Sequence, residues 1–222
     1  MDLLANEIAE KIRNKIECQE YKQGDHLTVR SLCEEFGTSE TPVKQAMNQL
    51  VATGLLVTVP KCGIKVRTFT FEDMKNVLEA RLMIEQFCSK DAIREAKENP
   101  VFTKKISECL ENCNETITAC IKDFTRERYY ETIPQDRMLH EMIVRCSNNA
   151  QIIRMYENLN SHAGMFLGYD VHSPEVMEDV KKEHMDIVLS LLRFDRHDLN
   201  EAIARHVQST IELYKKANYT AE

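Results

Sequence analysis

One short stretch, residues 55–67, limits the possible folds of this sequence more than any other part. Leu55-Leu56-Val57-Thr58-Val59 is rich in β-branched residues, Pro60-Lys61-Cys62-Gly63 has the composition of a turn, and Ile64-Lys65-Val66-Arg67 is extended again. This pattern predicts two strands joined by a turn. The apolar residues before and after this stretch recur at the spacing of helices, so a mainly α fold with one hairpin is predicted.

Three short helices are predicted ahead of the hairpin, over residues 2–18, 28–37 and 39–54. Thr28 is a suitable N-cap for the second helix, and the third opens at Ser39 or Thr41, with a proline in its first turn. Three helices and a hairpin within residues 1–69 describe a winged helix-turn-helix domain.

The remainder, residues 70–222, is predicted to be a second domain made only of helices. The chain has only 6 glycines and 5 prolines in 222 residues, which favours long helices over a turn-rich β protein. The predicted breaks divide this segment into about six helices of an antiparallel bundle, and they fall at Asn99-Pro100, Thr125, Asn148-Asn149, Gly168–Pro174 and Asp195.

The acidic charge of the chain is confined to the second domain. The net charge is −7, yet residues 1–69 carry nine basic and nine acidic side chains, and residues 70–222 carry twenty and twenty-seven. DNA binding by the first domain is therefore compatible with the overall charge.

The cysteines and the start of the chain predict a cytoplasmic protein. The eight cysteines are scattered, without a CxxC pair, and Cys109, Cys113 and Cys120 lie in register with isoleucines on one helical stripe. We interpret them as core residues in a reduced compartment, with a thiolate metal site as the less favoured alternative. Neither a signal peptide nor a membrane segment is predicted.

The start of the third helix has the residues needed to contact DNA. A helix of this kind enters the major groove with its first turn, where Ser39, Thr41 and the helix N-terminus can hold phosphate. Lys44 follows one turn later, and Arg30 on the preceding helix can contact the backbone. At the wing, Lys61 and Lys65 flank a glycine that permits close approach to a minor groove.

Residues 5–67 resemble the reading head of the GntR superfamily. The resemblance rests on Gly24-Asp25-x-Leu27, on Leu32-x3-Phe36-Gly37, on the run from Ser39 to Leu50 and on Gly63-x-x-Val66. It implies that the DNA-contacting positions are Arg30, Ser39, Glu40, Thr41, Lys44 and Gly63.

Glu40 departs from the family pattern, which usually has arginine there. Glutamate repels phosphate and accepts only from a cytosine amino group, whereas arginine grips guanine. We predict an operator that differs from the usual family half-site at that base pair; the alternative is that Glu40 simply points into solvent.

Four residues of the second domain have the spacing of a metal site. Asp136 and His140 lie four residues apart on one helix face, and His184 and His206 border the apolar stripes of two later helices. Three imidazoles and a carboxylate could bind Zn²⁺, Ni²⁺, Mn²⁺ or Fe²⁺ with positions left open. Separately buried, hydrogen-bonded histidines are the alternative that spacing alone leaves open.

The same four residues resemble the metal quartet of the FCD ligand-binding domain of the FadR subfamily. The matching patterns are Asp136-x3-His140, Ser147-Asn148-Asn149, Glu183-His184-x-x-Ile187 and Ala202-x3-His206, together with Arg81-x3-Glu85. The resemblance implies a metal that helps to hold a small carboxylic acid, with Arg81, Glu85 and Asn149 as effector-binding candidates. For Arg81, an ion pair with Glu85 within the helix is an equal alternative.

These features together predict a DNA-binding transcriptional regulator whose operator affinity is controlled by a small organic acid bound at a metal site. A homodimer and double-stranded operator DNA are the expected partners, and no membrane association is expected. A metal-responsive regulator without an organic effector is one alternative. A metalloenzyme with an appended DNA-binding head is less favoured, because the sequence shows no separate general base or nucleophile.

Overall fold

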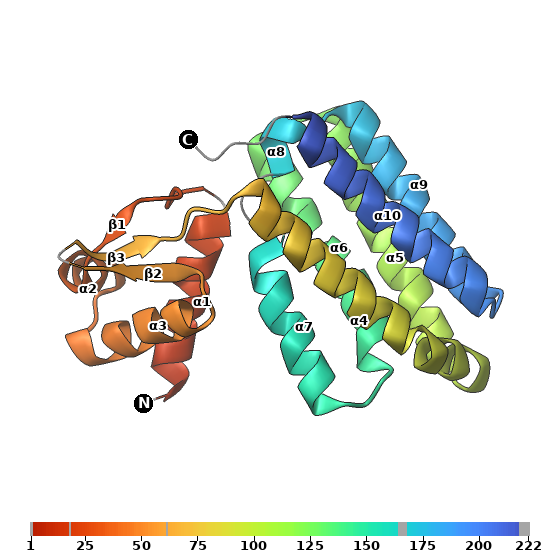
Figure 1. Cartoon of the computed structure of the whole chain (residues 1–222), viewed down its shortest axis with the longest axis horizontal. Coiled ribbons are helices and arrows are strands. Elements are labelled where there is room, and N and C mark those ends of the chain that lie inside the picture. The colour runs from red at the N-terminus through yellow and green to blue at the C-terminus, as the bar shows by residue number, and fades with distance from the viewer. Residues whose placement is uncertain (1, 18, 61, 164–167, 218–222) are drawn as a thin grey trace. The chain divides into compact units, whose positions relative to one another are not determined.

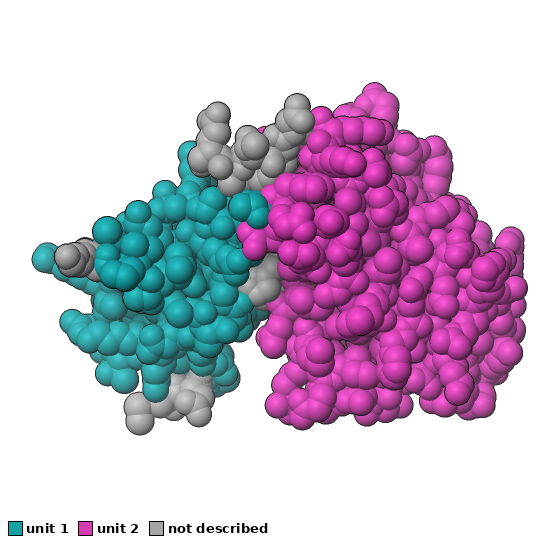
Figure 2. Space-filling view, in the orientation of Figure 1, with its two compact units in different colours: residues 1–70, 164–166, 221–222 teal, residues 71–163, 167–220 magenta. Residues whose placement is uncertain are grey.

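The computed structural model describes residues 2–17, 19–60, 62–163 and 168–217. These residues form two compact units, one within residues 1–70 and one that begins at residue 71, shown in separate colours in Figure 2. The mainly α fold predicted from the sequence, a small winged domain followed by a helical bundle, is confirmed.

The first unit is a winged helix-turn-helix (Figure 1). Its elements are α1 (Asp2–Glu17), β1 (His26–Leu27), α2 (Val29–Phe36), α3 (Glu40–Ala52), β2 (Leu56–Val59) and β3 (Gly63–Val66). The apolar faces of the three helices and the hairpin enclose a core that includes Ile12, Leu32, Met47, Leu50 and Leu56.

Local signals determine where the helices of this unit begin and end. The Thr28 hydroxyl accepts a hydrogen bond of 3.0 Å from the Ser31 amide at the start of α2. Gly37 ends α2 in the left-handed conformation with φ of 62°, which a glycine adopts without strain. Ser39 is the N-cap of α3. The helix-turn-helix geometry therefore follows from residues that sequence inspection had singled out.

The sheet contains one strand that the sequence did not predict. The hairpin β2–β3 pairs Leu56 with Val66 and Val59 with Gly63, and β1 adds to the other side of β3 in the order β1-β3-β2. β1 has only two residues, which is too short to show an alternation of apolar and polar side chains.

The second unit is a bundle of helices (Figure 1). Its elements are α4 (Phe71–Glu98), α5 (Pro100–Lys122), α6 (Arg126–Arg145), α7 (Ala150–Ala163), α8 (Gly168–Val171), α9 (Pro174–Leu192) and α10 (Arg196–Lys216). Six of these are long, as predicted, and α8 is a single turn. Asn99, Thr125, Ser173 and Asp195 cap the helices that follow them with their side chains.

The core of the bundle lies between α4, α5, α6, α9 and α10 and includes Ile106, Leu139, Ile143, Ile187 and Leu191. Cys109 belongs to this core, and Cys113 and Cys120 belong to a neighbouring one, so the prediction that these cysteines pack in the interior is confirmed. The seven cysteines among the described residues are all free thiols. None of the described helices is long and apolar enough to cross a membrane.

A charged network joins α1 to α2 in the first unit. Glu35 accepts a hydrogen bond of 2.5 Å from the Tyr21 hydroxyl and forms an ion pair of 2.9 Å with Lys15. The hydrogen bond from Tyr21, aided by Lys15, lowers the pKa of Glu35 below its ordinary value of 4.5. Ionised Glu35 therefore stabilises the folded head, and this contribution is lost as the pH falls below about 4.5.

We predict that Glu35→Gln destabilises the first unit at neutral pH by about 0.5–1 kcal/mol, because the pair is partly exposed. The difference from wild type should shrink as the pH falls below about 4.5 and Glu35 becomes protonated in the folded state as well. Hydrogen exchange at the α2 amides measures this loss of stability. Glu34→Gln, at the exposed neighbouring glutamate, is the control, and an equal effect of both variants would contradict the prediction.

Candidate functional site

The DNA-reading candidates lie on the exposed side of α2 and α3. Ser39, Glu40, Thr41 and Lys44 are all exposed at the start of α3, and Arg30 on α2 is exposed as well. The Ser39 side chain makes no cap hydrogen bond, so its hydroxyl is available to a ligand. The first turn of α3 therefore has free amides and a hydroxyl where a phosphate oxygen can bind.

Glu40 interacts with the nearest basic residue of the same helix. Its carboxylate forms an ion pair of 2.7 Å with Lys44, one turn further along α3. The hydrogen bond and the charge of Lys44 lower the pKa of Glu40 below its ordinary value. A phosphate must compete with Glu40 for Lys44, so this glutamate has a consequence for DNA binding even where it touches no base.

The wing is built around Gly63. This residue has φ of +82°, and a Cβ atom there would lie 3.0 Å from Nε2 of His26, so only glycine fits the hairpin without a shift. The His26 ring also hydrogen-bonds the Cys62 carbonyl. Lys61, predicted to flank the wing tip, lies outside the described residues.

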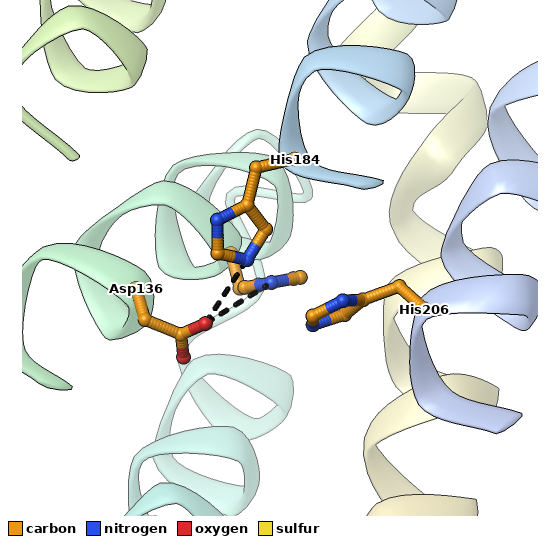
Figure 3. A group of neighbouring side chains, drawn as sticks. Asp136, His184 and His206 are labelled. Carbon is orange, nitrogen blue, oxygen red and sulfur yellow. Dashed lines mark ion pairs between the residues drawn. The ribbon is translucent and has the colours of Figure 1, made fainter. Parts of the chain in front are cut away.

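The second candidate site is a cluster of one carboxylate and three imidazoles inside the bundle. Asp136 and His140 come from α6, His184 from α9 and His206 from α10, and one ligand atom of each lies within 4.8 Å of the others. Figure 3 shows Asp136, His184 and His206 pointing toward one another from different helices. The structure thus brings together all four residues that the sequence predicted as metal ligands.

A second layer of residues holds the outer nitrogen of each ring. Nδ1 of His140 lies 2.8 Å from Glu85, and Nδ1 of His206 lies 2.9 Å from Glu183. Nδ1 of His184 lies 3.5 Å from the Cys113 thiol. A carboxylate that accepts a hydrogen bond from Nδ1–H leaves the lone pair on Nε2, which is the arrangement found around metal-bound histidines.

The inner nitrogens of His140 and His184 are buried beside Asp136. Nε2 of His140 is buried without a hydrogen bond and lies 3.9 Å from Asp136. Nε2 of His184 is buried as well, and the group that it meets is the Asp136 carboxylate, at 3.0 Å. Burial lowers the pKa of His184 to about 4, although the interaction with Asp136 raises it. Imidazole nitrogens that face a carboxylate in the interior fit a divalent cation.

Asp136 is the ligand closest to solvent, with a third of its side chain exposed. Although burial raises its pKa, the hydrogen bond from His184 and the charges of His140, His184 and Arg81 lower it well below the ordinary value. Asp136 is therefore an ionised carboxylate on the solvent-facing side of the cluster.

The three effector candidates have different surroundings. Glu85 is fully buried. Its carboxylate accepts a hydrogen bond of 3.3 Å from the Arg81 guanidinium and one of 2.5 Å from the Tyr156 hydroxyl, in addition to its contact with His140. Arg81 forms the ion pair with Glu85 within α4, which is the alternative that the sequence left open. Its charge also lowers the pKa of Asp136. Asn149 is exposed, and its side-chain oxygen caps the start of α7.

Three residues near the site were not assigned a role from the sequence. Glu183 was noted only as part of a motif, Cys113 was interpreted as core, and Tyr156 was not singled out. Each acts on a partner from another helix, and no spacing along the chain could reveal these contacts.

A winged helix-turn-helix joined to a helical domain is the architecture of a DNA-binding transcription regulator. The sequence profile of the bacterial regulatory proteins of the gntR family matches residues 4–66, and that of the FCD domain matches residues 76–209. Since the second match alone covers more than half of the chain, this protein belongs to the GntR family of regulators with an FCD domain.

Curated relatives agree with this assignment. The chain is 24% identical to the HTH-type transcriptional regulator YdhC of Bacillus subtilis (strain 168), over 88% of this chain and 84% of the relative. It is 22% identical to the HTH-type transcriptional repressor GlaR of Escherichia coli (strain K12), over 93% of each. These relatives are transcriptional regulators, not enzymes.

Solved structures show the same fold. E. coli McbR/YncC superposes with a TM-score of 0.79 at 19% identity, over 96% of this chain and 98% of the other. A GntR transcriptional regulator of Rhodococcus sp. RHA1 superposes with a TM-score of 0.80 at 15% identity, over 97% and 99%. The predicted GntR and FCD architecture is thereby confirmed.

The buried charges beside His140 yield a stability prediction. Replacing Glu85 with Leu strands the Arg81 guanidinium in the interior, which costs about 3–5 kcal/mol. Arg81→Met should cost less, because Glu85 keeps two of its donors, Tyr156 and His140. Chemical denaturation of the second unit, followed by circular dichroism, measures both. Equal losses of the free energy of unfolding in the two variants would show that Glu85 and Arg81 stabilise the fold only through their contact with each other.

Proposed function

We propose that this regulator binds a divalent metal through Asp136, His140, His184 and His206, and that a small organic acid bound at that metal controls its operator affinity. The observation that carries the proposal is the convergence of three buried imidazoles and Asp136 on one point, where Nε2 of His140 has no hydrogen-bond partner. A buried polar atom without a partner is costly, and a cation at the centre would remove that cost.

The donor set agrees with this role. Three neutral nitrogens and one carboxylate oxygen suit Zn²⁺, Ni²⁺, Mn²⁺ or Fe²⁺ and do not discriminate among them. Bound there, the metal would supply positive charge and open coordination positions to a carboxylate. Asp136 is the partly exposed ligand, so the open side of the cluster is expected beside it.

The surroundings of the three candidate effector residues support a different role for each. The Arg81 guanidinium acts on both Glu85 and Asp136, so it can add positive charge to the acid-binding side. Glu85 positions His140 and Arg81, and we propose an indirect role for it. Asn149 caps α7, and a direct effector contact would require that cap to open.

Control of transcription then follows from linkage. A ligand changes operator affinity by the ratio of its affinities for the two arrangements of the regulator. Two copies reading a pseudo-palindromic operator in the cytoplasm are the proposed working form.

Metal analysis is the first test. Purified without chelator, the native protein should contain one divalent metal per chain, and His140→Ala should lose it. His197→Ala, at an exposed histidine of α10, is the control and should retain the metal. Mass spectrometry of the released small molecules identifies the acid. A metal-free native protein would overturn the proposal and return the quartet to core histidines.

Operator binding separates the two kinds of sensor. The operator dissociation constant is measured for the protein with metal alone and for the protein with metal plus the identified acid. It should change only when the acid is added. If metal alone produces the full change, the chain is a metal sensor without an organic effector.

Glu40 provides the test of DNA reading. We expect Glu40→Ala to tighten non-specific DNA binding, since Lys44 becomes free to pair with phosphate. The slope of the logarithm of the binding constant against the logarithm of salt concentration should become steeper by about one. Lys44→Ala should weaken binding instead. Selection from random DNA should return a half-site that changes between native protein and Glu40→Arg. An unchanged half-site would mean that Glu40 reads no base.

A further inference from the structure

The ring of His184 has a different kind of outer partner from the other two rings of the quartet. The Nδ1 atoms of His140 and His206 each lie beside a carboxylate, at 2.8 Å and 2.9 Å. Nδ1 of His184 instead lies 3.5 Å from the Cys113 thiol. An ionised carboxylate only accepts a hydrogen bond, whereas a thiol can donate one or accept one, both weakly. The outer partner of His184 therefore leaves open which of the two ring nitrogens carries the proton.

Cys113 is held beside this ring as a neutral thiol. It lies on α5 with none of its surface exposed, in a cluster that includes Ile117, Tyr129 and Met177. Burial raises the pKa of the thiol, so the sulfur keeps its proton at neutral pH. Because α5 packs against α9, the helix that carries His184, the sulfur stays next to the ring. Cys113 can therefore act either as a donor or as an acceptor towards Nδ1.

The inner side of the same ring faces Asp136. Nε2 of His184 lies 3.0 Å from a carboxylate oxygen of Asp136, and a dashed line marks this pair in Figure 3. Asp136 is ionised, because its pKa lies well below the ordinary value, and an ionised carboxylate needs a donor opposite it. When no cation lies between the two groups, the proton of the neutral ring therefore belongs on Nε2. Nδ1 then accepts a hydrogen bond from the Cys113 thiol.

A His184 ring that binds a metal needs the opposite arrangement. Nε2 must offer its lone pair, so the single proton of the neutral ring is carried on Nδ1. The ring releases a proton from Nε2 to water and takes one up at Nδ1, and it is neutral before and after. Cys113 keeps its own proton throughout, and rotation of its S–H bond changes the sulfur from donor to acceptor. His184 can thus change tautomer without leaving Nδ1 unpaired.

We propose that Cys113 is a positioning residue that allows His184 to exchange its hydrogen bond with Asp136 for a bond to the metal. His184 is then the adaptable ligand of the quartet, while the carboxylate of Glu85 keeps the proton of His140 on Nδ1 in both states. The inference rests on the proposed metal site and names the residue that lets one ligand of that site change its role.

The tautomers of the histidine rings test the inference directly. The full-length protein is labelled with ¹⁵N in its histidines, and the ring nitrogens are observed by NMR after chelation and after saturation with Zn²⁺. The signals of the two rings are assigned by their loss in His184→Gln and His140→Gln. We expect His184 to carry its proton on Nε2 after chelation and on Nδ1 with Zn²⁺. His140 should carry its proton on Nδ1 in both samples.

Variants of two neighbouring cysteines separate this contact from simple packing. Cys113→Ala removes the partner of Nδ1 and should weaken Zn²⁺ binding about tenfold, the lower end of the effect of losing an outer hydrogen bond at a metal site. Cys113→Ser keeps a donor and an acceptor and should retain most of the affinity. Cys109→Ala is the matched control, since it deletes the same atoms one turn earlier on α5, and it should bind Zn²⁺ as the native protein does. The affinity is measured by competition with a chelator, on protein that circular dichroism shows to be folded.

Two results would overturn the inference. One is a His184 ring that carries its proton on Nδ1 in both samples. The other is a Cys113→Ala protein that binds Zn²⁺ no more weakly than Cys109→Ala does. In both cases the native protein still binds Zn²⁺, and the proposed metal site stands. A native protein that binds no Zn²⁺ would remove the proposed function together with the inference, so the two failures are distinguishable.

Discussion

The structure of the second unit depends on burying three imidazole rings side by side. The ring centroids of His140, His184 and His206 lie 4.8–5.4 Å apart in the interior of a helical bundle. Polar rings at this depth need a partner for each nitrogen. Glu85, Glu183 and Cys113 supply the outer partners from α4, α9 and α5, so most of the long helices of the bundle contribute a residue to this arrangement.

This requirement explains why α4 carries charge on its buried face. Arg81 and Glu85 would be costly in a core on their own, and an apolar pair of similar volume would often stabilise the fold equally well. Glu85 instead orients His140, and Arg81 compensates the carboxylate. The buried face of α4 therefore carries two charged residues that position the His/Asp cluster, where apolar side chains would pack more simply.

The sequence predicted the elements and the ligands better than it predicted the contacts between them. Helix ends at Asn99, Thr125 and Asp195 depend on caps of a few neighbouring residues, and such local signals are visible in the chain. The clustering of Asp136, His140, His184 and His206 was predictable in part because Asp136 and His140 share a helix face. The roles of Glu183, Cys113 and Tyr156 were not predictable, since each depends on which helices pack together. Asn149 matched a family pattern, but its helix cap appears only with the start of α7.

Charge and exposed apolar surface lie on opposite faces of the same turns of α4. Met83 and Phe87 are exposed, and Arg81 and Glu85 are buried within a span of seven residues. Glu85 contacts His140, and α4 begins at Phe71, directly after the reading head in the chain. Under the proposed function, α4 is therefore the shortest covalent connection between the quartet and the reading head. Binding at the quartet that shifts the backbone of α4 would reach the head through one helix, without a change of fold.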